Sequence, residues 1–285
     1  MKFLIVGQKR TGQIRRLRIE AKKLGHAVDG CLASDLIIES GSGVFNVYAN
    51  KENLSDYDLV YLCAGVEQKR RFEWYVAVDY LKKHFKTKIV NEMVINPSFR
   101  YYPVQSWFYL KEFEVGIPFP YTFTIYSEES LLKISKRLYY PLIVKISEMH
   151  RGTGIYLAKS ENEVKIIIRK NKNCTFLLRE YIPNNCDIRV FTIGFKAVGA
   201  MERKPKPEKR RIYNLHEHED VSDLAQKAVK ISGVEIAGVD IITDKNTNKN
   251  YLLEVNIGPK FSGLEKCGIN VAHEIIKYFV TKCKN

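Results

Sequence analysis

Near its C-terminus the chain reads Ile236-Ala237-Gly238-Val239-Asp240-Ile241-Ile242 and then, after a polar interval, Tyr251-Leu252-Leu253-Glu254-Val255-Asn256. Both stretches are rich in aliphatic residues, and turn-forming residues 243–250 separate them, so we predict two strands joined as a hairpin. Oxygen-bearing side chains interrupt the apolar pattern at Asp240, Glu254 and Asn256. Glu254 and Asn256 are two residues apart, which places them on the same face of a strand.

These three polar side chains predict a site for a hard cation. Burying two carboxylates together costs free energy unless a cation neutralises them. Oxygen ligands of this kind suit Mg²⁺, which proteins commonly hold together with nucleotide phosphates. A half-buried strand whose polar side chains face solvent gives the same pattern, so the two strands alone leave both interpretations open.

The composition is that of a globular protein with a substantial core. Of 285 residues, 45% are hydrophobic and 27% are charged, and this length suits one large domain or two to three small ones. No segment approaches the roughly 18 apolar residues that cross a membrane. The apolar run at residues 3–6 reads as a first strand, not a signal peptide. Six cysteines without a CxxC pair indicate free thiols and a cytoplasmic location.

The charge balance favours anionic partners. Lysine and arginine exceed aspartate and glutamate by 46 − 32, giving a net charge of +14, which suits nucleotides, acidic substrates or nucleic acid. The basic run at residues 203–211 fits recruitment of an acidic carboxylate substrate, and it fits a solvated loop equally well. No basic stripe with interleaved aromatic residues is present, so nucleic-acid binding stays a minor alternative, with steep salt dependence as its sign.

The first 95 or so residues alternate strand and helix patterns, which predicts a mostly parallel sheet. We expect strands over 2–7, 57–64 and 88–90, and helices over 12–24 and 72–85. The sequence at residues 7–12, GQKRTG, lacks the GxGxxG spacing of a dinucleotide site. Further along we expect helices over 106–114, 128–138, 161–170, 221–232 and 271–279, and strands over 141–146, 155–158, 176–182, 187–193 and 197–203.

Several charged residues sit in or beside these apolar strands. Lys145 lies inside the predicted strand at 141–146, where burial is costly unless the ammonium meets an anion; a lysine that reaches past the sheet edge to solvent is the simpler interpretation. Arginines at strand ends can clamp phosphate or carboxylate groups, and Arg179, Arg189 and Arg203 stand at such positions. Each could equally form a surface ion pair.

Taken in order, these pieces resemble the ATP-grasp ligases, and specifically their RimK-like carboxylate–amine (alpha-L-glutamate type) branch. The segments that carry the resemblance are "PLIVK" with Lys145, the glycine loop at 148–154, "REYIPNNCDIRVF", "AMERKPK", "NLH", "IAGVDII" and "LLEVNIGPKFSGLEKCGINVA". The match is dense from about residue 141 to 280 and only architectural before that. It implies an α/β (α+β) ATP-grasp fold with an N-terminal parallel α/β domain at 1–97, a central lid at 98–174 and a C-terminal catalytic part at 175–285.

The resemblance also implies roles for individual residues. Asp240, Glu254 and Asn256 would hold Mg²⁺, with two ions expected and Mn²⁺ as a substitute. The residues expected to bind ATP are Lys145 at the phosphates, Glu180, Tyr181 and Ile182 at the adenine, Asp187 at the ribose, and Arg179 without a specified contact. Arg189, Arg203 and Asn214 would face the transferred phosphoryl group. The implied reaction activates a carboxylate as an acyl phosphate, and an amino-acid amine, by default glutamate, then displaces phosphate to form an amide.

The chain departs from the branch at a few positions. Bulkier His150 and Arg151 stand in the glycine loop, Gln105 stands where a nucleotide-contacting lysine is common, Ile212 stands where an arginine is usual, and Lys260 with Phe261 replaces a Gly-Leu pair. These changes leave reduced activity open. The family is commonly dimeric or tetrameric, which leaves a homo-oligomer open, although no feature of the sequence shows one; no membrane partner is expected. A small-molecule kinase and a non-catalytic nucleotide-binding protein remain alternatives.

Overall fold

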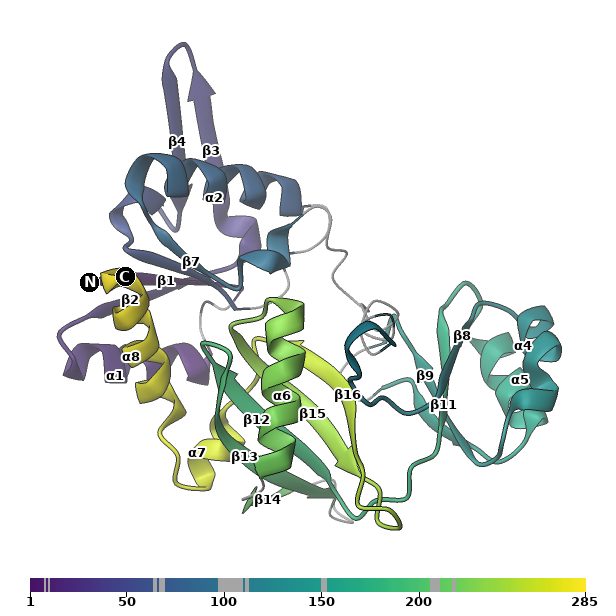
Figure 1. Ribbon diagram of the computed structural model, residues 1–285. Coiled ribbons are helices and arrows are strands. Elements are labelled where there is room, and N and C mark those ends of the chain that lie inside the picture. The colour runs from purple at the N-terminus through teal and green to yellow at the C-terminus, as the bar shows by residue number, and fades with distance from the viewer. Residues whose placement is uncertain are drawn as a thin grey trace. The chain divides into compact units, whose positions relative to one another are not determined.

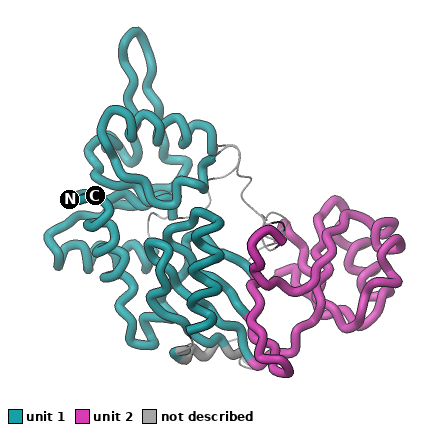
Figure 2. The backbone as a smooth tube through the Cα atoms, viewed as in Figure 1, with its two compact units in different colours: residues 1–101, 186–241, 254–285 teal, residues 102–185, 242–253 magenta. Residues whose placement is uncertain are grey.

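The computed structural model describes the chain except for residues 8, 10, 64–65, 67–69, 97–109, 111–112, 150–152, 206–210 and 217–218. The chain forms two compact units (Figure 2): unit 1 comprises Met1–Tyr101, Cys186–Ile241 and Glu254–Asn285, and unit 2 comprises Tyr102–Asn185 and Ile242–Leu253. The division into parts at 1–97, 98–174 and 175–285 stays a prediction. Among the described residues, no helix combines the length and apolar character needed to cross a lipid bilayer.

A parallel sheet begins unit 1, as the strand–helix alternation predicted. Its strand order is β2-β1-β6-β7, with β1 (Lys2–Val6), β2 (Ala27–Cys31), β6 (Leu59–Leu62) and β7 (Lys88–Val90) paired in parallel. Alternate residues of β1 enter two hydrophobic cores: Phe3 packs with α1 (Gly12–Lys23), and Leu4 packs with α2 (Arg71–Phe85). Helix α1 therefore lies on one face of the sheet and α2 on the other (Figure 1).

A small antiparallel sheet follows the first strands, and the sequence did not predict it. It consists of β3 (Leu36–Gly41), β4 (Val44–Ala49) and β5 (Glu52–Asn53). The strands do contain good strand formers, among them Ile37 and Ile38 of β3 and Val44, Phe45 and Tyr48 of β4. The local signal was therefore present, although β3 is largely exposed.

The second sheet of unit 1 carries most of the predicted metal and phosphate residues. Its order is β14-β13-β12-β15-β16, with β12 (Asp187–Ile193), β13 (Lys196–Pro205), β14 (Arg211–His216), β15 (Ile236–Thr243) and β16 (Asn250–Ile257). The neighbouring β15 and β16 confirm the predicted hairpin. In the run at 203–211, residues 203–205 end β13 and Arg211 begins β14, with Pro205 paired to Arg211. Residues 206–210, in the stretch interpreted as a basic loop, lie outside the described residues.

Helices α6 (Glu219–Ser232), α7 (Ser262–Lys266) and α8 (Val271–Lys284) complete unit 1. Phe279 of α8 packs edge-on against Phe3 of β1 and Tyr61 of β6, with ring centroids 5.4 and 5.6 Å apart. One hydrophobic cluster thus contains residues of the parallel sheet, of β12 and β13, and of α8. This shared core holds the two sheets of unit 1 together.

Unit 2 is built on an antiparallel sheet of order β10-β9-β11-β8. Its strands are β8 (Thr122–Ile125), β9 (Leu142–Ile146), β10 (Ile155–Ala158) and β11 (Phe176–Glu180). One face packs against α4 (Glu128–Ile134) and α5 (Glu161–Lys170), through Leu142, Val144 and Ile146. The helix predicted over 128–138 ends earlier and continues as a 3-10 turn over Ser135–Arg137. The helix expected over 106–114 lies largely outside the described residues.

Candidate active site

Asp240 is the centre of a buried charge cluster in unit 1. It lies on β15 and is 6% exposed. Arg189 on the neighbouring β12 donates a hydrogen bond to each carboxylate oxygen of Asp240, with Nε 2.7 Å from Oδ1 and Nη2 2.7 Å from Oδ2. Such a bidentate pair is among the stronger side-chain contacts. The strand order places β12 beside β15, so the sheet itself brings the two groups together.

Arg203 on β13 adds a second guanidinium to the cluster. It is 5% exposed, and its Nη2 lies 3.1 Å from Asp240 Oδ1 and forms an ion pair with Asp187. Asp187 sits directly opposite Arg203 in the β12–β13 register, which explains the pair. The Arg203 Nε is buried without a hydrogen-bond partner among the described residues. A buried unsatisfied donor is costly, so the cluster has capacity for a further acceptor.

The other two predicted metal ligands join the same cluster. Asn256 on β16 donates from Nδ2 to Asp240 Oδ2 at 3.3 Å. Glu254, two residues earlier, lies close enough to Arg189 that its charge raises the pKa of that guanidinium. Both side chains are half-buried. The structure therefore brings Asp240, Glu254 and Asn256 together with Arg189, as the predicted hairpin requires.

The cluster keeps its members ionised. Burial alone would raise the pKa of Asp240, but attraction to Arg189 and Arg203 outweighs it and lowers the pKa below its ordinary 3.8. Burial also acts to lower the pKa of Arg189, and the negative charges of Asp240, Glu254 and Asp187 reverse that effect. Opposite charges within a few ångströms favour both charged forms. The cluster is thus a permanently charged centre inside an apolar sheet.

The donor set fits a magnesium ion. It offers two carboxylates and one amide, the oxygen ligands that Mg²⁺ takes, and phosphate oxygens would complete the shell. No group of three histidine, cysteine, aspartate or glutamate side chains gathers as a metal site anywhere in the described part of the chain. Both oxygens of Asp240 accept hydrogen bonds from arginine. A cation that binds Asp240 therefore takes the place of arginine donors.

Gly238 makes room for Arg189, and the sequence interpretation did not single it out as a site residue. A Cβ added at Gly238 would lie 2.8 Å from Pro259 Cβ and 3.3 Å from Arg189 Cδ. Any other residue there would push against the arginine that holds Asp240. Glycine inside a strand commonly marks such a close approach, so the segment IAGVDII already contained the signal.

Unit 2 carries two of the predicted nucleotide-binding cations on one face of its sheet. Lys145 on β9 and Arg179 on β11 share the face that is turned away from the helix-covered core, because Arg179 pairs with Ile143, two residues from Lys145. Lys145 is half-buried and Arg179 is buried. Lys145 and Arg179 therefore belong to the same face of one sheet.

The segment expected to meet adenine follows directly at the end of β11. Glu180 is tied to Tyr121 by two 2.8 Å hydrogen bonds: its backbone N–H donates to the Tyr121 carbonyl, and its Oε1 accepts from the Tyr121 N–H. Tyr181 is 41% exposed, whereas Ile182 is buried. Their contact with a base stays a prediction.

The remaining predicted residues lie partly outside the described structure. Asn214 occupies β14 at the position opposite Glu202, and its side chain is not among those described; the same holds for Ile212. Gln105, His150 and Arg151 lie outside the described residues. Lys260 is exposed, and Phe261 is buried in the core of unit 1.

Comparison with known proteins identifies relatives for the second part of the chain. Residues 110–279 match the family model of the RimK-like ATP-grasp domain. A probable alpha-L-glutamate ligase of Legionella pneumophila is 34% identical over 158 residues, which cover 50% of this chain and 51% of that protein. The ribosomal protein bS6–L-glutamate ligase of Escherichia coli is 33% identical over 153 residues, covering 48% and 50%. The chain thus matches about half the length of these curated relatives.

Solved structures resemble the chain over almost its whole length. The ATP-grasp ligase PsnB, complexed with a phosphomimetic variant of a minimal precursor, Mg and ADP, superposes with a TM-score of 0.78 at 13% identity, covering 99% of this chain and 98% of that one. A RimK domain ATP-grasp protein from Sphaerobacter thermophilus gives 0.69 at 15% identity, covering 98% and 99%. These likenesses establish the α/β ATP-grasp fold, and the family match over more than half the chain shows that it belongs to the RimK-like ATP-grasp family.

Proposed function

We propose that the chain is an ATP- and Mg²⁺-dependent carboxylate–amine ligase that forms an amide bond through an acyl phosphate. The observation that carries this proposal is the cluster in which Asp240, Arg189, Arg203, Glu254 and Asn256 meet. It combines oxygen ligands for a cation with the half-buried guanidinium of Arg189 and the buried guanidinium of Arg203. That combination suits a reaction in which a carboxylate and a triphosphate, both negative, must be held together.

Each part of the cluster has a role in this reaction. Asp240, Glu254 and Asn256 would hold Mg²⁺, which supplies charge neutralisation at the phosphates when bound; a second ion, and Mn²⁺ as a substitute, belong to the same proposal. Arg189 and Arg203 would orient the phosphoryl group and offset its charge, and the buried Arg203 Nε provides a donor for a phosphate oxygen. Asn214 is proposed beside them.

Further residues are proposed to contact the nucleotide. Lys145 and Arg179 would contact the phosphates, and Glu180, Tyr181 and Ile182 would contact the adenine. Asp187 is proposed at the ribose, which requires it to exchange its ion pair with Arg203 for a hydroxyl group. Such an exchange would also release Arg203 toward the phosphates.

The reaction proceeds in two balanced steps. A substrate carboxylate oxygen attacks the γ-phosphorus of ATP, the bond to the β-phosphate oxygen breaks, and ADP leaves. The amine nitrogen then attacks the acyl carbon, the carbon–oxygen bond to phosphate breaks, inorganic phosphate leaves, and the amine loses a proton. Positioning supplies much of the rate gain in such a reaction.

The substrate class follows from charge and from the relatives. The net charge of +14 and the basic run at 203–211 suit an acidic carboxylate substrate. Curated relatives are named as glutamate ligases, so glutamate is the first amine to test. A peptide or protein carboxylate is the first acid to test, and the proposal includes a cytoplasmic homo-oligomer.

The test measures ADP and inorganic phosphate released from Mg·ATP, with pools of amino acids crossed against pools of acidic peptides and metabolites. A ligase requires both an acid and an amine and releases both products in equal amounts. ADP without phosphate would identify a kinase instead. Glu254→Gln serves as the control for contaminating ATPase, since equal release from both proteins would contradict catalysis by this cluster.

A further inference from the structure

A polar cavity lies beside the outer edge of β2 in unit 1, away from every residue assigned above. Its lining includes Lys9, Arg18, Asp29, Glu52 and Tyr57, and its volume is about 310 Å³. That is near the lower end of the roughly 300–1,000 Å³ range of small-molecule pockets. The size indicates a compact ligand and not an extended one.

The floor of the cavity is the outer edge of strand β2. Ala27 N–H donates to the Met1 carbonyl, and the Cys31 carbonyl accepts from the Gly7 N–H. The odd-numbered residues of β2 therefore face β1, and the backbone groups of Val28 and Gly30 face outward. Side chains cap the outward carbonyls: Arg18 Nε donates to Val28 O at 2.9 Å, and Asn50 Nδ2 donates to Gly30 O at 2.8 Å.

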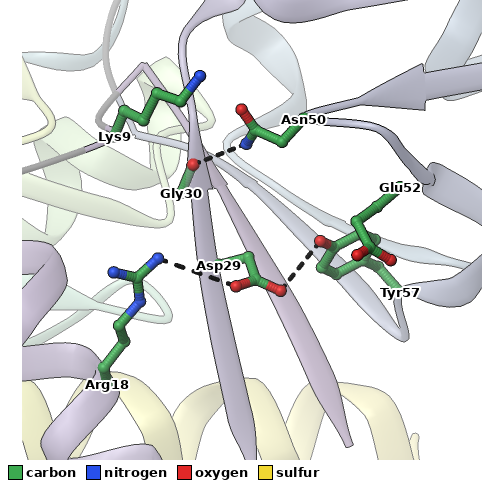
Figure 3. Close-up of a pocket in the computed structure, with 7 residues that line it drawn as sticks. All are labelled: Lys9, Arg18, Asp29, Gly30, Asn50, Glu52 and Tyr57. Carbon is green, nitrogen blue, oxygen red and sulfur yellow. Dashed lines mark hydrogen bonds and ion pairs between the residues drawn. The ribbon is translucent and has the colours of Figure 1, made fainter.

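The charges lining the cavity are balanced and separated. Figure 3 shows Lys9 and Arg18 on one side of the view, Glu52 with Tyr57 on the other, and Asp29 between them. Arg18 contacts Asp29 only loosely, at 3.8 Å, and its side chain is 49% exposed. Lys9 also pairs with Asp35 at 2.8 Å and Glu52 with Lys2 at 3.1 Å, and all four of these side chains are partly exposed. A simple anion such as phosphate could replace only Asp35 at Lys9, whereas a ligand that carries both charges could also replace Lys2 at Glu52.

Two polar groups provide further recognition. Asn50 Oδ1 is buried without a hydrogen-bond partner among the described residues, while the Nδ2 of the same amide donates a hydrogen bond to the Gly30 carbonyl. An acceptor in that state favours a ligand with an N–H group. Tyr57 donates to Asp29 Oδ2 at 3.1 Å, and burial together with the charge of Asp29 raises the pKa of its phenol, so the hydroxyl stays a donor.

We propose that this cavity binds a free α-amino acid, with the carboxylate beside Arg18 and Lys9 and the ammonium beside Glu52, Asp29 and Asn50 Oδ1. The site is separate from the residues proposed for nucleotide, metal and phosphoryl contacts. It rests on the proposed function only in the choice of L-glutamate as the first ligand. The binding itself involves no ATP and no reaction.

The experiment is calorimetric titration of the full chain, without nucleotide, with L-glutamate and then each other standard amino acid. We expect at least one to bind with a dissociation constant of roughly 1 mM or tighter. For glutamate, N-acetyl-L-glutamate lacks the ammonium and 4-aminobutyrate lacks the α-carboxylate, so each should bind about tenfold more weakly or worse. Binding of either analogue as tightly as glutamate would overturn the zwitterion assignment.

Variants then locate the site. Arg18→Gln and Glu52→Gln should each weaken binding about tenfold, whereas Arg18→Lys should keep part of the affinity. Lys83→Gln is the matched control, because Lys83 forms an exposed ion pair with Asp79 on α2, outside the cavity. Circular dichroism confirms that each variant is folded. No binding by any amino acid, or binding unchanged in both cavity variants, would overturn the proposal even if the ligase assay succeeds.

Discussion

Asp240 and Lys145 look alike in the sequence, each a single charge inside an apolar strand, but the fold accommodates them in different ways. Asp240 on β15 is 6% exposed and is neutralised by Arg189 on the neighbouring β12 and by Arg203 on β13. Lys145 on β9 is half-buried on the sheet face that points away from the core of unit 2. A buried charge must be paired inside the protein, whereas a half-buried lysine can keep its ammonium group in contact with solvent.

Because the two charges differ in burial, we expect the removal of Asp240 and the removal of Lys145 to have different effects on stability and on nucleotide binding. Asp240 should be needed for folding stability as well as for function. Its loss would remove the carboxylate that pairs with the guanidinium groups of both Arg189 and Arg203. Lys145 should be needed for nucleotide binding alone. The experiments below test this contrast, beginning with the largest effect.

Asp240→Asn should give the largest loss of stability. The variant keeps the shape of the side chain but removes the charge that pairs with Arg189 and Arg203, and breaking a buried pair costs about 3–5 kcal/mol. Denaturant unfolding of the purified chain measures this. Asp79→Asn, at an exposed helical ion pair, is the control and should change little. A loss for Asp240→Asn as small as for the control would break the contrast.

Gly238→Ala should give the next largest effect. The new Cβ would lie 2.8 Å from Pro259 Cβ and 3.3 Å from Arg189 Cδ, and overpacking of this kind costs roughly 1–3 kcal/mol. The displaced Arg189 should also lower ligase activity. Gly41→Ala is the matched control, since its Cβ would meet nothing within 4 Å. Equal unfolding midpoints for the two variants would show that Arg189 does not depend on the glycine.

Lys145→Met should separate binding from stability. The half-buried position tolerates an apolar side chain of similar length, so stability should stay within about 0.5 kcal/mol. Loss of a charged hydrogen bond to phosphate should weaken ADP binding about tenfold. Unfolding and calorimetric titration on the same sample give both values. A large stability loss with unchanged ADP affinity would reverse the roles assigned to Lys145 and Asp240.

The smallest effect concerns pH. The folded-state pKa of Asp240 is lowered, so its stabilising contribution is complete above the unfolded pKa of about 3.9 and is lost as pH falls through the folded value. The stability difference between the wild type and Asp240→Asn should therefore be nearly constant from about pH 7 to 5 and shrink only below about 4. Urea unfolding across this range measures it; a difference that already shrinks near pH 6 contradicts the assignment.

The sequence predicted much of this architecture because several of its patterns are local. The alternation over the first strands, the apolar spacing of α1 and the hairpin of β15 and β16 are all visible in short windows. The resemblance to a family placed Asp240, Glu254 and Asn256 in one group, and the structure brings them together.

Other features depend on residues far apart in the chain. Arg189 and Asp240 are separated by 51 positions, and only the adjacency of β12 and β15 shows that they form a pair. The cavity beside β2 likewise collects Lys9, Arg18, Asp29 and Glu52 from different elements. Such arrangements arise from tertiary packing, which a single sequence does not encode in any local window.

In the proposed function, the cluster around Asp240 holds Mg²⁺ together with the nucleotide phosphates. ADP binding to the intact chain, measured with and without Mg²⁺ for the wild type and for Glu254→Gln, tests this proposal. We predict that Mg²⁺ strengthens ADP binding to the wild type by about tenfold and leaves binding to Glu254→Gln unchanged. Equal affinities with and without Mg²⁺ in the wild type, or the same Mg²⁺ effect in both proteins, would contradict the claim.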